Sequence, residues 1–271
     1  MPVISTIISA IIFLTGLAVG SFLNCVIYRL EIGGSFLKGR SFCPFCKHKL
    51  FWFDLIPVFS FLFLRAKCRY CKKPISVQYP LVELATGILF VLLWNYELGI
   101  MNYKFLSFEF IIYFLFLILI SSFLILIFVF DLKHYIIPDK VVLPAIIIIF
   151  IYNLQFLIFK NFSTFNRLIL SGFGAAGFFL LIFLLSKGRA MGGGDVKLGF
   201  LMGFLLGFPD ILPALFFTFL IGAIIGIGLI LTKKKKLKSE VPFGPFLVLG
   251  TYIAIFWGQA LVNWYLSLFG L

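Results

Sequence analysis

Long apolar stretches separated by short polar breaks occupy almost the whole chain. Breaks at charged residues, Gly and Pro divide the sequence into eight apolar segments. A membrane core of about 30 Å requires about 20 apolar residues in one helix. We therefore predict about eight transmembrane helices, near residues 4–28, 80–97, 105–130, 140–159, 167–186, 197–208, 211–231 and 243–265. The segment 197–208 is short, so we expect it to tilt, to thin the bilayer or to begin within the preceding glycines.

The composition agrees with a membrane protein and excludes an ordinary soluble fold. Of the 271 residues, 62% are hydrophobic and 12% are charged, and the mean hydropathy is +1.15. Soluble domains have an apolar share of about 45–50%. The predicted fold class is therefore an all-α polytopic membrane protein.

Basic residues are distributed very unequally between the two predicted faces. When the loops are assigned alternately, one side receives 20 of the 23 Lys and Arg residues, and the other receives Lys104, Lys160 and Arg167. Because cytoplasmic loops carry the excess of basic residues, the first side is expected to be cytoplasmic. The net charge of +13 then acts as a topology signal and a contact for anionic membrane lipid, and no nucleic acid is needed to explain it.

Four of the five cysteines lie in the only sizeable polar segment, about 31–79. Cys43, Cys46, Cys68 and Cys71 form the pattern C-x2-C-x21-C-x2-C, which is close to the spacing of zinc ribbons. Two disulfides are the alternative, but thiols stay reduced on the cytoplasmic side. Four thiolates leave no position for water, so the predicted zinc is structural. His48 is a possible substitute ligand.

Two aspartates interrupt or border apolar runs. Asp131 follows the uncharged residues 111–130, and Asp195 lies within Met191-Gly-Gly-Gly-Asp-Val-Lys197. Between them the chain crosses the membrane twice, so both acids are expected at the cytoplasmic boundary. Ionisable residues there indicate function. Asp139 lies on the same side and stays open as a participant, although its place after Pro138 is typical of a helix start.

Two facing carboxylates suit aspartic-protease chemistry. One stays protonated because two like charges a few ångströms apart cannot both ionise, while the other activates a water against a carbonyl. Gly192, Gly193 and Gly194 would let the backbone approach an extended peptide. The alternatives are a turn or close helix packing for the glycines, and ion pairs with Lys133 or Lys197 for the acids.

The ends of the predicted helices suggest a division of roles between the acids. Asp195 is expected to open a helix, where the positive end of the helix dipole favours the ionised form. Asp131 is expected to close one, where the negative end favours the protonated form. Asp195 would then be the base that activates water, and Asp131 the proton donor.

Six motifs are spread over nearly the whole chain. They are Gly20-Ser-Phe-Leu-Asn-Cys-Val-Ile-Tyr-Arg-Leu30, the two C-x-x-C pairs, Gln78-Tyr-Pro-Leu-Val-Glu-Leu84, Phe130-Asp-Leu-Lys-His-Tyr-Ile-Ile-Pro-Asp139, Gly192-Gly-Gly-Asp-Val-Lys197 and Val241-Pro-Phe-Gly-Pro-Phe246. In this order and combination the chain resembles the type IV prepilin peptidase family, the leader peptidases of pili, type II secretion and competence systems.

The resemblance implies an activity, a location and site residues. It implies a membrane aspartic endopeptidase of the bacterial inner membrane that cuts the basic leader from prepilins or pseudopilins after a Gly, at the cytoplasmic face. The catalytic acids map onto Asp131 and Asp195, with Gly192, Gly194, Asp139 and Lys197 as supporting residues. Many members with the cysteine loop also methylate the new N-terminus with S-adenosylmethionine, an activity for which the sequence assigns no residues.

The resulting organisation has three parts. These are a first transmembrane helix at 1–30, a cytoplasmic four-cysteine zinc-binding loop domain at 31–79 and a transmembrane aspartic peptidase domain at 80–271.

Glu83, in an apolar segment, matches a family glutamate, either as a packing hydrogen-bonder or as part of a substrate or methyl-donor site.

Two functions of other classes compete with the peptidase. A transporter or proton relay would use Asp131 and Asp195 as intramembrane acids, but it predicts inverted repeats or acids near the midplane. A membrane-anchored recruiter would use the basic cysteine loop to bind a partner, but it gives the distant acids no role.

Overall fold

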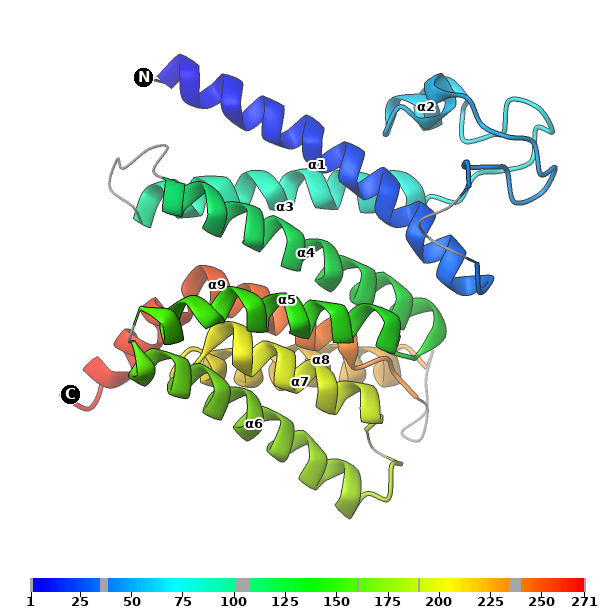
Figure 1. The fold of residues 1–271 in the computed structure, drawn as a ribbon. Coiled ribbons are helices and arrows are strands. Elements are labelled where there is room, and N and C mark those ends of the chain that lie inside the picture. Colours follow the sequence, from blue (N-terminus) through cyan, green and yellow to red (C-terminus); the bar gives the residue numbers. More distant parts are fainter. Residues whose placement is uncertain are drawn as a thin grey trace. The chain divides into compact units, whose positions relative to one another are not determined.

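The computed structural model of the chain describes residues 2–34, 39–100, 108–159, 161–189, 191–233 and 240–270 (Figure 1). The lysines expected at 234–236 and 238 on the cytoplasmic side lie outside these residues.

The chain divides into two compact units, Met1–Leu126 and Ile127–Leu271. The helices of the first unit are α1 (Pro2–Glu31), the 3-10 helix η1 (Trp52–Leu55), α2 (Phe59–Phe63), α3 (Gln78–Ile100) and the first part of α4 (Phe108–His134). The second unit holds the end of α4, α5 (Asp139–Ile158), α6 (Phe162–Leu185), α7 (Gly193–Leu206), α8 (Ile211–Leu231) and α9 (Gly244–Ser267).

The all-α polytopic fold class is confirmed. Among the described residues, seven helices are long and apolar enough to cross a membrane, and no strand forms. They match seven of the predicted segments, with ends shifted by a few residues and Ile211–Leu231 unchanged. The chain is a multi-pass membrane protein.

The eighth predicted segment, 197–208, corresponds to α7, which has only 14 residues. At about 1.5 Å per residue it is about 21 Å long, less than the thickness of the hydrocarbon core. It begins within the glycine stretch and ends at Gly207, whose φ is 73°. The described residues thus contain seven helices of full span length and one shorter helix, α7, at the segment that was expected to be short.

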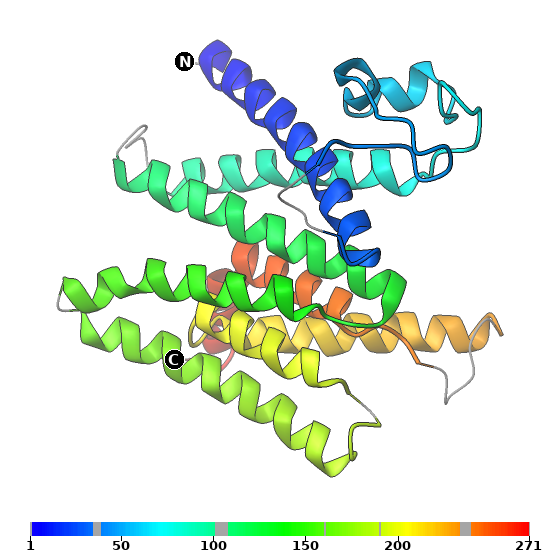
Figure 2. The ribbon, with the colours of Figure 1, turned by 45° about the vertical axis from the view of Figure 1, so that its right-hand side comes forward.

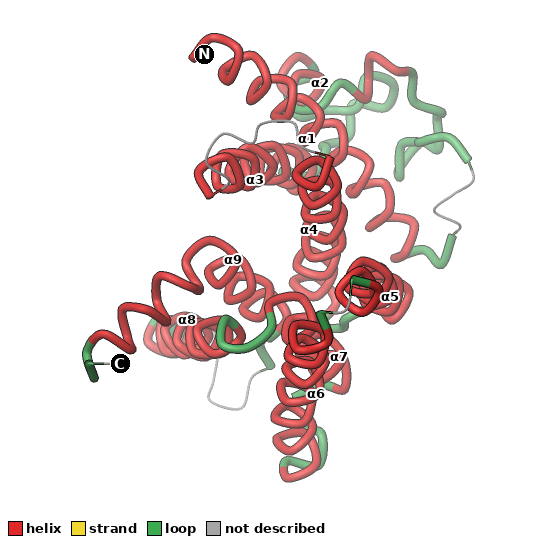
Figure 3. The backbone as a smooth tube through the Cα atoms, turned by 60° about the vertical axis from the view of Figure 1, so that its left-hand side comes forward, coloured by secondary structure: helices red, strands yellow, loops and turns green. Residues whose placement is uncertain are grey.

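The short helix α7 lies inside the second unit. It contacts α5, α6, α8 and α9, and α6 and α7 run side by side in Figures 2 and 3. Its fully covered side chains include Leu198, Leu201 and Met202. Because other helices cover α7, it can end short of the membrane surface without exposing its backbone to lipid.

In the first unit, α1 and α3 cross closely because glycines lie at the crossing. A methyl group on Gly16 would lie 2.7 Å from Cα of Gly87, and one on Gly20 would lie 2.7 Å from Cα of Glu83. Small residues allow membrane helices to approach in this way. The crossing therefore places Glu83 against α1.

Candidate active site and metal centre

Asp131 is held by the start of a helix that is distant in sequence. It lies in the last turns of α4 with a relative exposure of 4%. Its Oδ2 accepts a hydrogen bond from the Gly244 N–H, the first residue of α9, at 2.9 Å. A methyl group on Gly244 would lie 2.7 Å from the same Oδ2. Glycine at 244 therefore lets the backbone reach the carboxylate.

Asp195 is held by its own glycine loop. It is the third residue of α7, with a relative exposure of 8%, and its Oδ2 accepts the Gly192 N–H at 2.9 Å. This contact closes the first turn of the helix, where free N–H groups favour an acidic side chain. The sequence expectation that Asp195 opens a helix agrees with this placement.

The two carboxylates lie near each other within the second unit. The segments that carry them pack against each other, since a methyl group on Gly194 would lie 2.9 Å from Cβ of Ile137. Both are nearly covered, and each accepts a backbone N–H. The fold thus brings together the two acids that the sequence singled out, 64 positions apart in the numbering.

Helix α9 changes the division of roles that the helix ends predicted for the two acids. Asp131 lies near the closing end of α4, as expected, but it also accepts an N–H from the opening end of α9. An N–H donor at a helix start favours a carboxylate. Because both acids have such a donor, the helix ends no longer distinguish a base from a proton donor.

The glycines next to Asp195 differ in their surroundings. A methyl group on Gly194 would lie 2.9 Å from Cβ of Ile137, whereas one on Gly193 would meet nothing within 4 Å. Gly192 supplies the N–H to Asp195. At Gly194 the close approach is to the segment that follows Asp131, so this glycine packs the two acid-bearing segments together.

Asp139 and Lys197 pair with each other at the surface. The Lys197 Nζ lies 2.6 Å from the Asp139 Oδ1, and the two side chains are 42% and 56% exposed. Asp139 is the first residue of α5, as its place after Pro138 predicted. Lys197 therefore pairs with Asp139 and not with Asp131 or Asp195.

The four cysteines of the predicted zinc site converge. Their Sγ atoms all lie within 4.8 Å of one another, and Cys43 Sγ is 3.9 Å from Cys71 Sγ. Tetrahedral coordination with zinc–sulfur bonds of about 2.3 Å would separate the sulfurs by about 3.8 Å. All four are free thiols. The set therefore fits a tetrahedral metal ion.

The two cysteine pairs lie on turns of the same construction. In the first, the Cys43 N–H donates to the His48 carbonyl at 2.9 Å; in the second, the Cys68 N–H donates to the Lys73 carbonyl at 2.8 Å. An isolated antiparallel bridge closes each turn. The His48 ring is not a member of the metal-holding group, and it stacks on Tyr70 with the centroids 3.7 Å apart.

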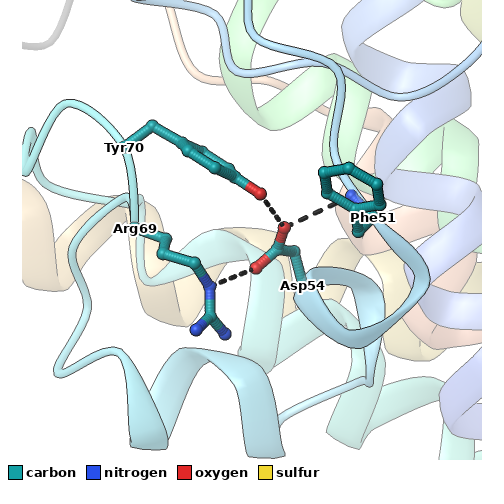
Figure 4. Close-up of polar contacts among 4 residues, drawn as sticks. All are labelled: Phe51, Asp54, Arg69 and Tyr70. Atoms are coloured by element: carbon teal, nitrogen blue, oxygen red, sulfur yellow. Dashed lines mark hydrogen bonds and ion pairs between the residues drawn. The ribbon is translucent and has the colours of Figure 1, made fainter.

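Asp54 fastens the second cysteine turn to η1 (Figure 4). Its Oδ1 accepts the Arg69 Nε at 2.8 Å, and its Oδ2 accepts the Tyr70 hydroxyl at 3.0 Å and the Phe51 N–H at 3.2 Å. Burial by itself would raise the pKa of Asp54, but the hydrogen bonds from Arg69, Phe51 and Tyr70 hold it below its usual value. Arg69 and Tyr70 lie between Cys68 and Cys71, so this carboxylate orients the metal-binding turn.

Glu83 links the cysteine loop to the membrane helices. Its side chain is buried, and Oε2 accepts the Val58 N–H at 2.7 Å. The sequence left two roles open for Glu83, and this contact corresponds to the first of them, a buried residue that packs and forms a hydrogen bond.

Three residues that make contacts in these sites were not predicted from the sequence: Gly244, Asp54 and Val58. Gly244 stood within a recognised motif, but nothing local indicated that its N–H meets Asp131. Asp54 and Val58 carried no motif at all. The available signals were Pro245 directly after Gly244, which is typical of a helix start, and a lone acid in the apolar stretch 51–63.

Comparison with known proteins matches both halves of the chain to peptidase family models. Residues 14–96 match the family model described as Bacterial Peptidase A24 N-terminal domain, and residues 118–227 match the one described as Type IV leader peptidase family. No solved structure matches the chain.

Three similar proteins all carry the name prepilin leader peptidase/N-methyltransferase. The protein of Aeromonas hydrophila is 30% identical over 96% of this chain and 94% of its own length. The protein of Bacillus subtilis (strain 168) is 32% identical over 96% of this chain and 98% of its own length. The protein of Legionella pneumophila is 32% identical over 95% of this chain and 94% of its own length. These matches do not favour the transporter or recruiter alternatives. With both halves of the chain matched and full-length relatives at this identity, the chain belongs to the type IV leader peptidase family.

Proposed function

We propose that the chain is a prepilin leader peptidase whose Asp131 and Asp195 hydrolyse the bond between the basic leader and the mature pilin. The observation that carries the proposal is the pair of covered carboxylates, which lie on segments that pack together at Gly194 and Ile137 and which each accept a glycine N–H. The family match and the names of the relatives support prepilins or pseudopilins as substrates.

Hydrolysis needs one ionised and one protonated carboxyl group. The ionised carboxylate takes a proton from water, whose oxygen attacks the carbonyl carbon of the scissile bond. The protonated acid donates to the carbonyl oxygen, and the C–N bond breaks as the leaving amine receives a proton. Two like charges in a covered site cannot both persist, so the pair shares one proton.

The deciding experiment removes each acid separately. Asp131→Asn and Asp195→Asn in reconstituted vesicles should each abolish cleavage of a prepilin, while expression and membrane insertion stay unchanged. Near wild-type cleavage by either variant would refute the assignment. Asp139→Asn is the matched control, because Asp139 is an exposed acid paired with Lys197.

The four thiolates of Cys43, Cys46, Cys68 and Cys71 would hold one zinc ion. Zinc with four protein ligands is structural, so the ion would stabilise the 31–79 loop domain and take no part in hydrolysis. The 3.9 Å separation between Cys43 and Cys71 sulfurs supports this ligand set.

We also propose N-methylation of the new N-terminus with S-adenosylmethionine as methyl donor. The support is the second half of the relatives' name, which the cited proteins share. The cofactor would supply the methyl group, and we assign it no residues of this chain.

The inner membrane is the proposed location, with the acids and the cysteine loop at the cytoplasmic face. The distribution of 20 of 23 basic residues to one side supports this orientation. Anionic lipid is the proposed surface partner of these residues, and nucleic acid is not a proposed partner.

A further inference from the structure

The segment 51–63 is the most apolar part of the cysteine loop and leaves its apolar side chains uncovered. Its sequence is Phe-Trp-Phe-Asp-Leu-Ile-Pro-Val-Phe-Ser-Phe-Leu-Phe. Neither η1 nor α2 contributes a buried residue. Eight of the large apolar side chains are exposed: Phe51, Trp52, Phe53, Leu55, Ile56, Phe59, Leu62 and Phe63. An uncovered surface of this kind indicates a partner or a membrane.

The only charged side chain of the segment is turned away from this surface. Asp54 has a side-chain exposure of 3% and is bonded to Arg69 and Tyr70 of the second cysteine turn (Figure 4). By contrast, Trp52 is 76% exposed and Phe63 is 84% exposed. The inward ion pair therefore leaves an outer face formed by aromatic and aliphatic groups.

A hydrogen bond to a membrane-spanning helix fixes the position of residues 51–63 along that helix. The Val58 N–H donates to Glu83 Oε2 at 2.7 Å, and Glu83 lies within the candidate span Gln78–Leu98. Glu83 is five residues from the start of α3, which at 1.5 Å per residue is about 8 Å along its axis. In Figures 1 and 2, α2 lies beside the end of α3 at which that helix begins. Glu83 therefore lies near one end of the span, the part of a membrane helix that is nearest to the headgroups.

Cations flank the apolar segment on both sides in sequence. Lys47 and Lys49 precede it, and Arg65 and Lys67 follow it. Trp and Phe beside Lys and Arg are typical of segments that lie in the interface of an anionic bilayer. Basic residues near such a surface are attracted to the headgroups.

We propose that residues 51–63 form a membrane-interface anchor, in which the exposed side chains insert into the headgroup and acyl boundary of anionic phospholipid beside α1 and α3. The occupant of this face is the bilayer. The cysteine loop is then a structure that is fixed to the membrane surface through Glu83 and through lipid, instead of a freely solvated domain. This proposal is independent of the chemistry of Asp131 and Asp195.

Photolabelling of the full chain in vesicles tests the anchor. The protein is reconstituted into vesicles that contain anionic phospholipid, and a carbene reagent dissolved in the acyl phase is activated by light. Peptides are then analysed by mass spectrometry. Residues 51–63 should be labelled at a yield comparable with that of α8 and several-fold above that of residues 39–49, which are the internal control within the same loop.

Two variants sharpen the test. Trp52→Ser with Phe63→Ser should lower the labelling of 51–63 several-fold, with the metal content unchanged. Phe45→Ser is the matched control, because Phe45 is an exposed aromatic residue of the first cysteine turn; it should leave the labelling of 51–63 unchanged. Labelling of 51–63 no higher than that of 39–49 would overturn the proposal. So would protection of 51–63 from a water-soluble reagent only after a prepilin is added, because that result identifies a peptide-docking face.

Discussion

The Gly244 N–H donates to Asp131 Oδ2 at 2.9 Å, joining the first residue of α9 to an acid 113 positions earlier. A side chain at 244 would collide with this oxygen, because a Cβ there would lie 2.7 Å from it. The contact couples the start of one membrane helix to the end of another within the second unit. It makes Gly244 a positioning residue for the proposed hydrolysis.

Gly244→Ala should therefore impair cleavage strongly without preventing insertion. The added methyl group would push Asp131 from its place, and displacement of a reacting group by about 1 Å can cost about 100-fold in rate. Prepilin cleavage in vesicles measures the effect as kcat. Gly226→Ala in α8 is the control, since a Cβ at 226 meets nothing within 4 Å. Equal activity of the two variants would contradict the role of Gly244.

Removing the Asp139 and Lys197 pair should have little effect. Both partners are exposed, and an exposed ion pair contributes about 0–1 kcal/mol to the free energy of unfolding. Lys197→Gln should retain most cleavage activity and shift the thermal unfolding midpoint only slightly. A loss of cleavage as deep as that of Asp195→Asn would instead place Lys197 in the catalytic machinery.

Purified protein should contain about one zinc ion per chain, because four thiolates form a closed tetrahedral shell. Elemental analysis of protein purified without chelator measures the content. Cys68→Ser with Cys71→Ser should lose the ion and increase proteolysis within 39–79. Cys25→Ser is the control, since Cys25 lies outside the four-sulfur group. Metal-free wild-type protein with intact disulfides would contradict the prediction.

Asp54→Ala should weaken metal retention by about 10- to 100-fold, the usual cost of losing a residue that orients metal ligands. The pKa of Asp54 is lowered, so its contribution is present above the pKa of the unfolded chain, about 3.9, and is lost only as pH falls through the lower folded value. The deficit, measured by competition with a chelator, should therefore be equal at pH 6 and pH 8. A deficit confined to one of these values would contradict this account.

Methyl transfer should be separable from cleavage. Asp195→Asn given a prepilin should transfer no label from S-adenosylmethionine, because no new N-terminus forms. The same variant given a pre-cut pilin should label it at close to the wild-type rate. If the wild-type protein fails to label pre-cut pilin, the chain has the peptidase activity alone.

The sequence by itself determined the membrane class, the positions of seven spans and the residues that can bind a metal or act as acid and base. Apolar runs of about 20 residues indicate spans because the bilayer imposes that length on any helix. The cysteine spacing indicated a metal site because each C-x-x-C pair folds locally into one tight turn. The two acids were conspicuous because charge beside hydrocarbon is costly.

The tertiary structure alone decided how these parts meet. No local pattern in α7 reveals that neighbouring helices cover it, so the sequence indicated only a short membrane segment there. The contacts of Asp131 with Gly244 and of Glu83 with Val58 join residues 113 and 25 positions apart. Such contacts depend on how whole helices pack, which is set by the summed fit of many side chains and not by the residues that make the bond.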